Sequence, residues 1–180
     1  MEIRYTADPV RFERMNTEEI RKEFLIDKLF NEDSVDLLYS DIDRVIVGSA
    51  VVVNKKLKLS ACDELRVEYF CQRRELGILN IGGAGKVTVD SQQYTVENQQ
   101  CLYVAMGSKE VAFESTNSES PAVFYLLSYP AHKSYKTKLI TKDEAEKVNL
   151  GSMEASNKRV IYKYIRPGGV DSCQLVMGVT

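Results

Sequence analysis

Short alternating segments separated by turn residues fill the stretch 69–111, and this pattern restricts the chain to an all-β fold. Polar and apolar residues alternate at 86–89, as they do on a half-buried strand. Apolar runs at 78–81 and 101–105 are separated by the glycine-rich sequence at 82–85 and by other polar turns. Turns at intervals of about 8–12 residues predict a β-sandwich or barrel.

The same alternation extends beyond this stretch and indicates one β domain over residues 34–180. A glycine at 48 separates two of its expected segments, and the last segment is strongly apolar. The further strands are expected at 35–39, 44–47, 50–53, 94–96, 111–113, 122–127, 158–165 and 173–179. The glycines at 82–85 are expected to form a turn by supplying positive φ, because no Lys-Ser/Thr pair or helix follows them as in a phosphate loop.

Residues 1–33 are predicted to be an N-terminal arm with one helix at 17–25. Asn16 caps its first turn, and Glu19 can reach back to the cap as in a capping box. Ile20 and Phe24 lie on one face of this helix, and we expect that face to pack on the barrel.

Composition excludes several classes of function. The 180 residues include 24 basic and 26 acidic side chains, which are intermixed and leave a net charge of −2. The sequence has no stripe of basic residues of the kind that binds nucleic acid, so no nucleic-acid partner is expected. No apolar run approaches the ~18–20 residues of a membrane span. The 4 cysteines lack the Cys-x-x-Cys spacing of zinc sites. They are expected to be reduced thiols in a cytoplasmic protein.

The order of glycines and strand residues resembles the cupin family, whose fold is a small jelly-roll. The resemblance rests on the spacing Gly-x-Gly-x-Val-x-Val-Asp at 83–90 and on Gly107. Cupins hold a metal with His-x-His, a Glu and a later His, and here none of the three histidines is present. The four corresponding positions are Tyr69, Cys71, Glu75 and Glu110. The resemblance therefore implies a cupin-like jelly-roll that holds no metal.

Three successive charges, Arg73, Arg74 and Glu75, lie next to an apolar run. The arginines either bind a carboxylate through paired hydrogen bonds or belong to a structural or interface ion network. In the cupin register, Arg73 and Glu75 face the barrel interior and Arg74 points to the other face. We therefore expect Arg73 to form a charge pair with Glu75 or Glu110 in the vacant metal position. His132 is either a general acid or base, or a loop residue that faces solvent. Arg74 and His132 are thus the candidates for substrate binding, and no residue is predicted to be catalytic.

Longer strings resemble one family of enzymes, the 4-deoxy-L-threo-5-hexosulose-uronate ketol-isomerases of pectin degradation. The strings are YSDIDRVIVG, QRRELGILNIGGAGKVTVD, YPAHKSY and CQLVMG. The resemblance implies metal-assisted proton transfer that converts the keto-uronate into 3-deoxy-D-glycero-2,5-hexodiulosonate. It also implies a homohexamer of two-part chains, with zinc bound by His and Glu residues of the second cupin half.

On this resemblance the chain is expected to be truncated before the second half, and no zinc ligand falls within it. Two hypotheses follow for its function. It is either the N-terminal half of the isomerase, inactive alone, or a non-catalytic cupin module that binds a sugar acid or mediates assembly.

Overall fold

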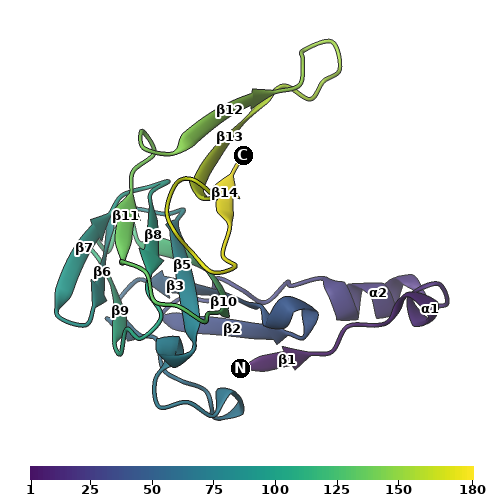
Figure 1. Ribbon diagram of the computed structural model, residues 1–180, viewed down its shortest axis with the longest axis horizontal. Coiled ribbons are helices and arrows are strands. Elements are labelled where there is room, and N and C mark those ends of the chain that lie inside the picture. The colour runs from purple at the N-terminus through teal and green to yellow at the C-terminus, as the bar shows by residue number, and fades with distance from the viewer.

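The computed structural model describes residues 1–180, and its regular structure consists mainly of strands in three β-sheets (Figure 1). The strands are β1 (Glu2–Arg4), β2 (Ser34–Ser40), β3 (Ile46–Val52), β4 (Leu57–Lys58), β5 (Arg74–Asn80), β6 (Gly85–Val89), β7 (Gln92–Val96), β8 (Cys101–Val104), β9 (Val111–Ser115), β10 (Ala122–Pro130), β11 (Lys138–Ile140), β12 (Glu146–Leu150), β13 (Arg159–Ile165) and β14 (Met177–Val179). The helices are α1 (Pro9–Phe12), α2 (Thr17–Phe24) and the 3-10 turns η1 (Ile42–Arg44), η2 (Asp63–Leu65) and η3 (Phe70–Gln72). The predicted all-β, cupin-like jelly-roll is confirmed.

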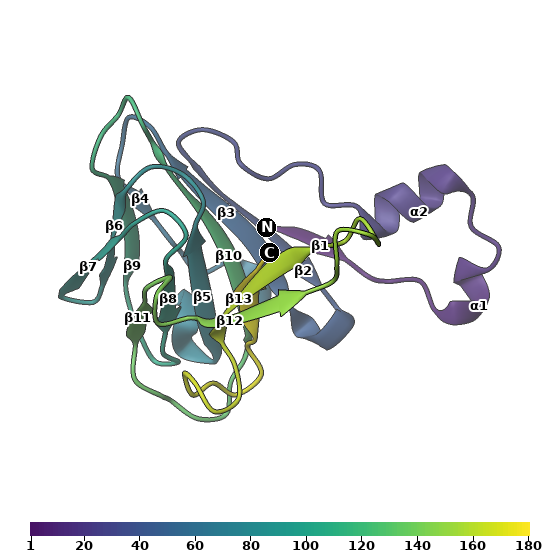
Figure 2. The same cartoon turned by 90° about the horizontal axis from the view of Figure 1, so that it is seen from above.

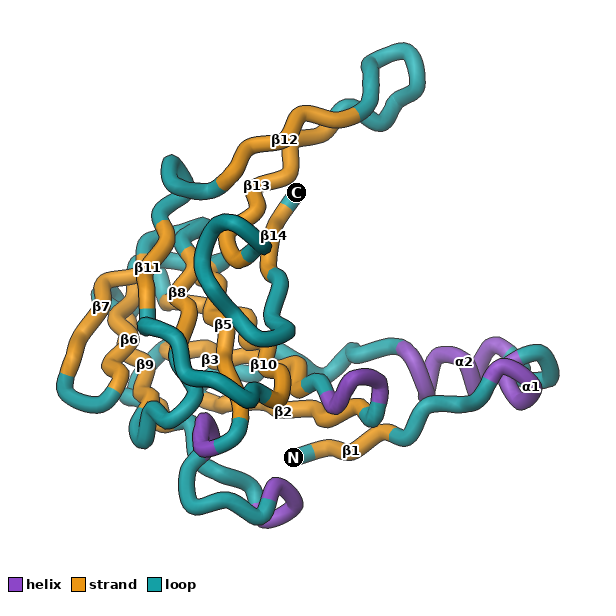
Figure 3. The backbone as a smooth tube through the Cα atoms, viewed as in Figure 1, coloured by secondary structure: helices purple, strands orange, loops and turns teal.

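Two of the sheets form the sandwich. The larger sheet has 7 strands in the order β1-β2-β3-β10-β5-β8-β11, and the smaller has 4 strands in the order β4-β9-β6-β7. All of their pairings are antiparallel except that of β1 with β2. The third sheet, β12-β13-β14, extends from the sandwich as the chain approaches its last residue (Figures 1 and 3).

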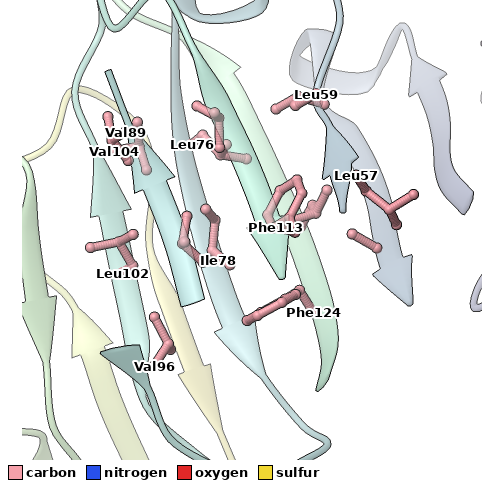
Figure 4. Close-up of a cluster of buried hydrophobic side chains, with 14 of the residues drawn as sticks. Leu57, Leu59, Leu76, Ile78, Val89, Val96, Leu102, Val104, Phe113 and Phe124 are labelled. Atoms are coloured by element: carbon pink, nitrogen blue, oxygen red, sulfur yellow. The ribbon is translucent and has the colours of Figure 1, made fainter. Parts of the chain in front are cut away.

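Alternating side chains from both large sheets build the main core. On β6, Val87 and Val89 are buried while Lys86 and Thr88 are more exposed, as the alternation predicts. Both valines belong to one core cluster with Phe113 of the same sheet and with Leu76 and Ile78 of the opposite sheet. Figure 4 labels Val89 and these last three residues. Burial of these side chains is the dominant favourable contribution to folding, at roughly 25 cal/mol per Å² of apolar surface.

A second core covers the outer face of the large sheet. Leu79 and Tyr103 point away from the main core and pack against Leu175 and Met177. Every residue of β5 is therefore buried, because the sandwich covers one face and the last part of the chain covers the other. In Figure 1 this last part is the yellow segment that crosses β5 and β8.

The helix predicted at 17–25 is present as α2, and its capping box is confirmed. The Asn16 side chain accepts from Glu19 N at 3.0 Å, and Glu19 Oε2 accepts from Asn16 N at 2.8 Å. The predicted packing of the helix on the barrel is wrong. Phe24 is 42% exposed, and α1 and α2 project away from the sandwich in both views (Figures 1 and 2). Phe24 instead meets Phe12 edge to face, with ring centroids 5.7 Å apart.

Three local predictions need correction. Gly48 lies within the continuous strand β3, so the strands expected at 44–47 and 50–53 are one. Only the end of the apolar run 173–179 is a strand, namely β14. The glycines at 82–85 form a turn without positive φ. They are needed because the backbone approaches closely: a Cβ on Gly83 would lie 2.0 Å from Ser120 O.

No helix of the structure is long and apolar enough to cross a membrane. All four cysteines are free thiols.

The cysteines divide into two pairs that should react differently with iodoacetamide. Cys71 and Cys101 are buried, and burial raises the pKa of Cys71 to about 12 and also raises that of Cys101. Cys62 and Cys173 are only partly buried. At pH 8 we expect Cys71 and Cys101 to be alkylated at least about 10-fold more slowly than Cys62 and Cys173. Peptide mass spectrometry of native and urea-unfolded protein measures this, and equal labelling of all four in the native state would contradict it.

Candidate functional site

The four positions that correspond to cupin metal ligands do not converge on one point. Cys71 lies in the main core on η3, and Tyr69 precedes it, half-buried. Glu75 lies on the opposite face of the large sheet, next to the second core. Glu110 is on the outer surface of the small sheet, where it pairs with Lys58 at 2.8 Å. Cys71 and Glu75 lie on opposite faces because η3 interrupts the strand alternation before β5 begins.

Glu75 is a fully buried carboxylate that the last part of the chain surrounds with donors. Its Oε1 accepts from the backbone N–H groups of Gln174 at 2.7 Å and Leu175 at 2.8 Å. Its Oε2 accepts from Cys173 N at 2.8 Å and from the hydroxyl of Tyr103 at 2.9 Å. Burial, and then the hydrogen bond to Glu75, raise the pKa of Tyr103. The arrangement fastens residues 173–175 to the sheet.

The predicted charge pair of Arg73 with Glu75 or Glu110 is wrong. Arg73 is exposed and forms no salt bridge, and every partner of Glu75 is a backbone N–H or Tyr103. The residue that is buried instead is Arg74, which was predicted to point away from the interior. Its side chain lies at the end of β5, where β10 and η1 meet it.

Arg74 is held by neutral acceptors. Nε donates to Ser128 Oγ at 3.1 Å, and Nη2 donates to Ser128 O at 2.8 Å and to Arg44 O at 2.6 Å. Ser128 Oγ in turn donates to Glu75 O at 2.7 Å. Burial lowers the pKa of Arg74 to about 10, and Tyr39 and Cys71 oppose that shift.

A cavity of about 340 Å³ opens beside Arg74, between the N-terminal strand and the end of the large sheet. Its charged members are Arg44, Arg73, Arg74 and Glu64. The other lining residues are Met1, Ile3, Tyr5, Tyr39, Leu65, Val67 and Pro130.

His132 lies outside this cavity. It is exposed in the loop between β10 and β11, and it makes no hydrogen bond to another residue. The two residues predicted for substrate binding are therefore not joined in one site, although Arg74 pairs in register with Pro130, two residues before His132.

The side chains of residues 1–180 do not fit a zinc ion. Glu75 has both carboxylate oxygens saturated by four donor groups, Glu110 faces solvent, and the Cys71 thiol is protonated at neutral pH. No group of three or more His, Cys, Asp or Glu side chains is placed to hold a metal. Zinc in proteins needs three or four such ligands at one point.

Sequence reasoning missed the partners of both buried charges. Tyr103 and residues 173–175 gave no local signal that they would surround Glu75. Ser128, which holds Arg74, lies 54 residues from it in the chain. Only the apolar residues on both sides of the charged triplet indicated that some of these charges would be buried.

Comparison with known proteins identifies the family to which the chain is similar. The model of the KduI/IolB family matches residues 24–180. A relative from Lachnoclostridium phytofermentans, named 4-deoxy-L-threo-5-hexosulose-uronate ketol-isomerase, is 53% identical over 180 residues, which are 100% of this chain and 65% of the relative. A relative of the same name from Caldicellulosiruptor bescii is 47% identical over 180 residues, with the same coverage. The chain thus spans about 65% of the length of these relatives.

One solved structure supports the fold. A crystal structure of an IolB-like protein from Salmonella typhimurium superposes with a TM-score of 0.55 at 12% identity. The match covers 71% of this chain and 47% of that protein.

Proposed function

The chain belongs to the KduI/IolB family, and we propose that it is the N-terminal part of a ketol-isomerase of pectin-derived uronates. The enzyme would convert 4-deoxy-L-threo-5-hexosulose uronate into 3-deoxy-D-glycero-2,5-hexodiulosonate. The observation that carries the proposal is 53% identity to a ketol-isomerase along all 180 residues. The match runs through every strand and loop of the chain, so it supports a shared activity as well as a shared fold.

In this proposal residues 34–180 are a cupin-like domain without a metal, and residues 1–33 are its N-terminal arm. Zinc would be bound by residues beyond this 180-residue stretch, because the donors present here are dispersed or already hydrogen-bonded. No step of the proton transfer is assigned to a residue of this chain. Its part is to supply a rigid scaffold.

We propose further that the enzyme is cytoplasmic and assembles as a homohexamer. Four free thiols are in keeping with a reducing compartment. The N-terminal arm exposes the apolar side chains of Val10, Phe12 and Phe24. Apolar surface of this kind supports a contact with another subunit.

Residues 1–180 alone are expected to have no isomerase activity, because they do not assemble a set of metal ligands. The measurement compares conversion of the keto-uronate by this chain, by the chain extended to the length of its relatives, and by the Lachnoclostridium relative as positive control. The extended protein should turn over substrate, bind zinc by elemental analysis, and lose activity to a chelator.

Two outcomes would contradict the proposal. Turnover by residues 1–180 at a rate comparable to that of the extended protein would place the catalytic groups in this chain. An extended protein that is folded and zinc-loaded yet inactive would favour the non-catalytic module.

A further inference from the structure

Arg74 is a buried cation without a counter-ion. The residue is 6% exposed, and its three hydrogen bonds go to a hydroxyl and two backbone carbonyls. No salt bridge of the structure includes it. A buried charge is ordinarily paired, because removing it from water is costly. The missing negative charge therefore indicates a partner that is not part of the chain.

The free edge of the guanidinium points to where that partner would bind. Nε and Nη2 are occupied, and Nη1 makes no hydrogen bond with another residue. No fully buried side-chain nitrogen or oxygen lacks a partner, so Nη1 reaches solvent. Arg74 also lines the 340 Å³ cavity, and Nη1 is the atom available to a molecule inside it.

The remaining lining has the chemistry of a site for an organic anion. Arg44 and Arg73 add two exposed guanidinium groups, neither of which is paired with a carboxylate, against a single acid, Glu64. Apolar side chains such as Leu65 and Pro130 form other walls. The volume is at the lower end of the range of ligand pockets, about 300–1,000 Å³.

We propose that this cavity binds a small organic carboxylate, with the carboxylate on Nη1 of Arg74 and the carbon skeleton against the apolar walls. A planar guanidinium suits a carboxylate, with Arg73 or Arg44 as the second donor. Inorganic phosphate would satisfy the charge but would leave the apolar walls without a partner. The site is independent of the proposed isomerase activity, because it needs neither metal nor turnover.

The first experiment uses a matched pair of sugars on the 180-residue chain. D-galacturonate and D-galactose are both six-carbon sugars, but only galacturonate carries a carboxylate. Arg Nε–Hε NMR signals are followed during titration, and the Arg74 signal is identified by its loss in Arg74→Lys. We expect galacturonate to shift this signal saturably at millimolar concentrations and galactose to leave it unchanged.

Variants then locate the binding site. Arg73→Gln removes an exposed guanidinium from the wall and should weaken galacturonate binding by about 2–5-fold without affecting the fold. Arg74→Lys keeps the positive charge but loses the planar guanidinium and its paired N–H donors. It should weaken galacturonate binding by about 10-fold or more. Arg21→Gln on α2 is the matched control outside the cavity and should bind as wild type does. Calorimetry gives the affinities, and thermal unfolding confirms that each variant is folded.

The proposal is overturned if galactose binds as well as galacturonate, or if neither shifts the Arg74 signal at tens of millimolar. It is also overturned if inorganic phosphate competes with equal affinity, since the cavity would then attract any anion. Calorimetry of wild-type protein with the two sugars, and of Arg73→Gln with galacturonate, needs no signal assignment, so this comparison still tests the proposal if Arg74→Lys is unstable.

Discussion

Replacing Glu75 with alanine is expected to lower the free energy of unfolding by at least about 3 kcal/mol. The carboxylate is 0% exposed and accepts from three consecutive backbone N–H groups and from Tyr103. Alanine leaves these donors buried without an acceptor, and each such group costs about 1–3 kcal/mol. The losses do not simply add, because residues 173–175 can move away and regain water. Urea denaturation followed by circular dichroism measures the change.

The matched control is Glu110→Ala. Glu110 is a glutamate too, but its side chain is 62% exposed and its partner is a surface lysine, Lys58. We therefore expect a loss under about 1 kcal/mol. Glu75→Gln should fall between the two, because its amide can accept fewer hydrogen bonds than a carboxylate. A loss below about 1 kcal/mol for Glu75→Ala would mean that residues 173–175 contribute no stability through this contact.

Replacing Asn80 with alanine is expected to lower the free energy of unfolding by about 2–4 kcal/mol. Asn80 is 0% exposed at the end of β5. Its Nδ2 donates to Gly83 O at 2.8 Å and to Val96 O at 2.7 Å, and its Oδ1 accepts from Gly82 N at 3.0 Å. These bonds fix the glycine turn against β7, and alanine would leave three backbone groups unpaired.

Asn98 provides the control, since it binds the same turn from the surface. Its Nδ2 donates to Gly82 O at 2.9 Å, and the residue is exposed. Water can replace that single bond, so Asn98→Ala should cost under about 1 kcal/mol. Equal losses for the two variants in the same urea titration would show that burial of the Asn80 network adds nothing.

The elements that sequence patterns predicted well are those decided by neighbours in the chain. The capping box of Asn16 and Glu19 involves residues three apart, and it is present. Val87 and Val89 alternate with polar residues, and they are buried as expected. The packing of α2 was predicted wrongly because it depends on where the arm leaves the sheet, which no local pattern records.

The candidate site was harder to predict because β5 is buried on both faces. On such a strand the residues facing each side are both apolar, so polar and apolar residues do not alternate. The sequence therefore does not reveal which side Arg74 or Glu75 faces. The cupin spacing assigned Glu75 to the interior, while η3 shifted the start of the strand and reversed the assignment. Arg74 was recognised as a candidate, but its acceptors on Ser128 and Arg44 come from segments brought close only by the fold.

The hydrogen bonds that close over Glu75 also have a consequence for synthesis on the ribosome. They join residues 98–100 positions apart. At a synthesis rate of about 5–20 residues per second, β5 emerges roughly 5–20 s before its last partners do. During that interval the outer face of the large sheet exposes a charged group and unpaired apolar side chains. We therefore expect nascent chains that stop before residue 173 to be chaperone clients, and release from the chaperone to coincide with the arrival of residues 173–175.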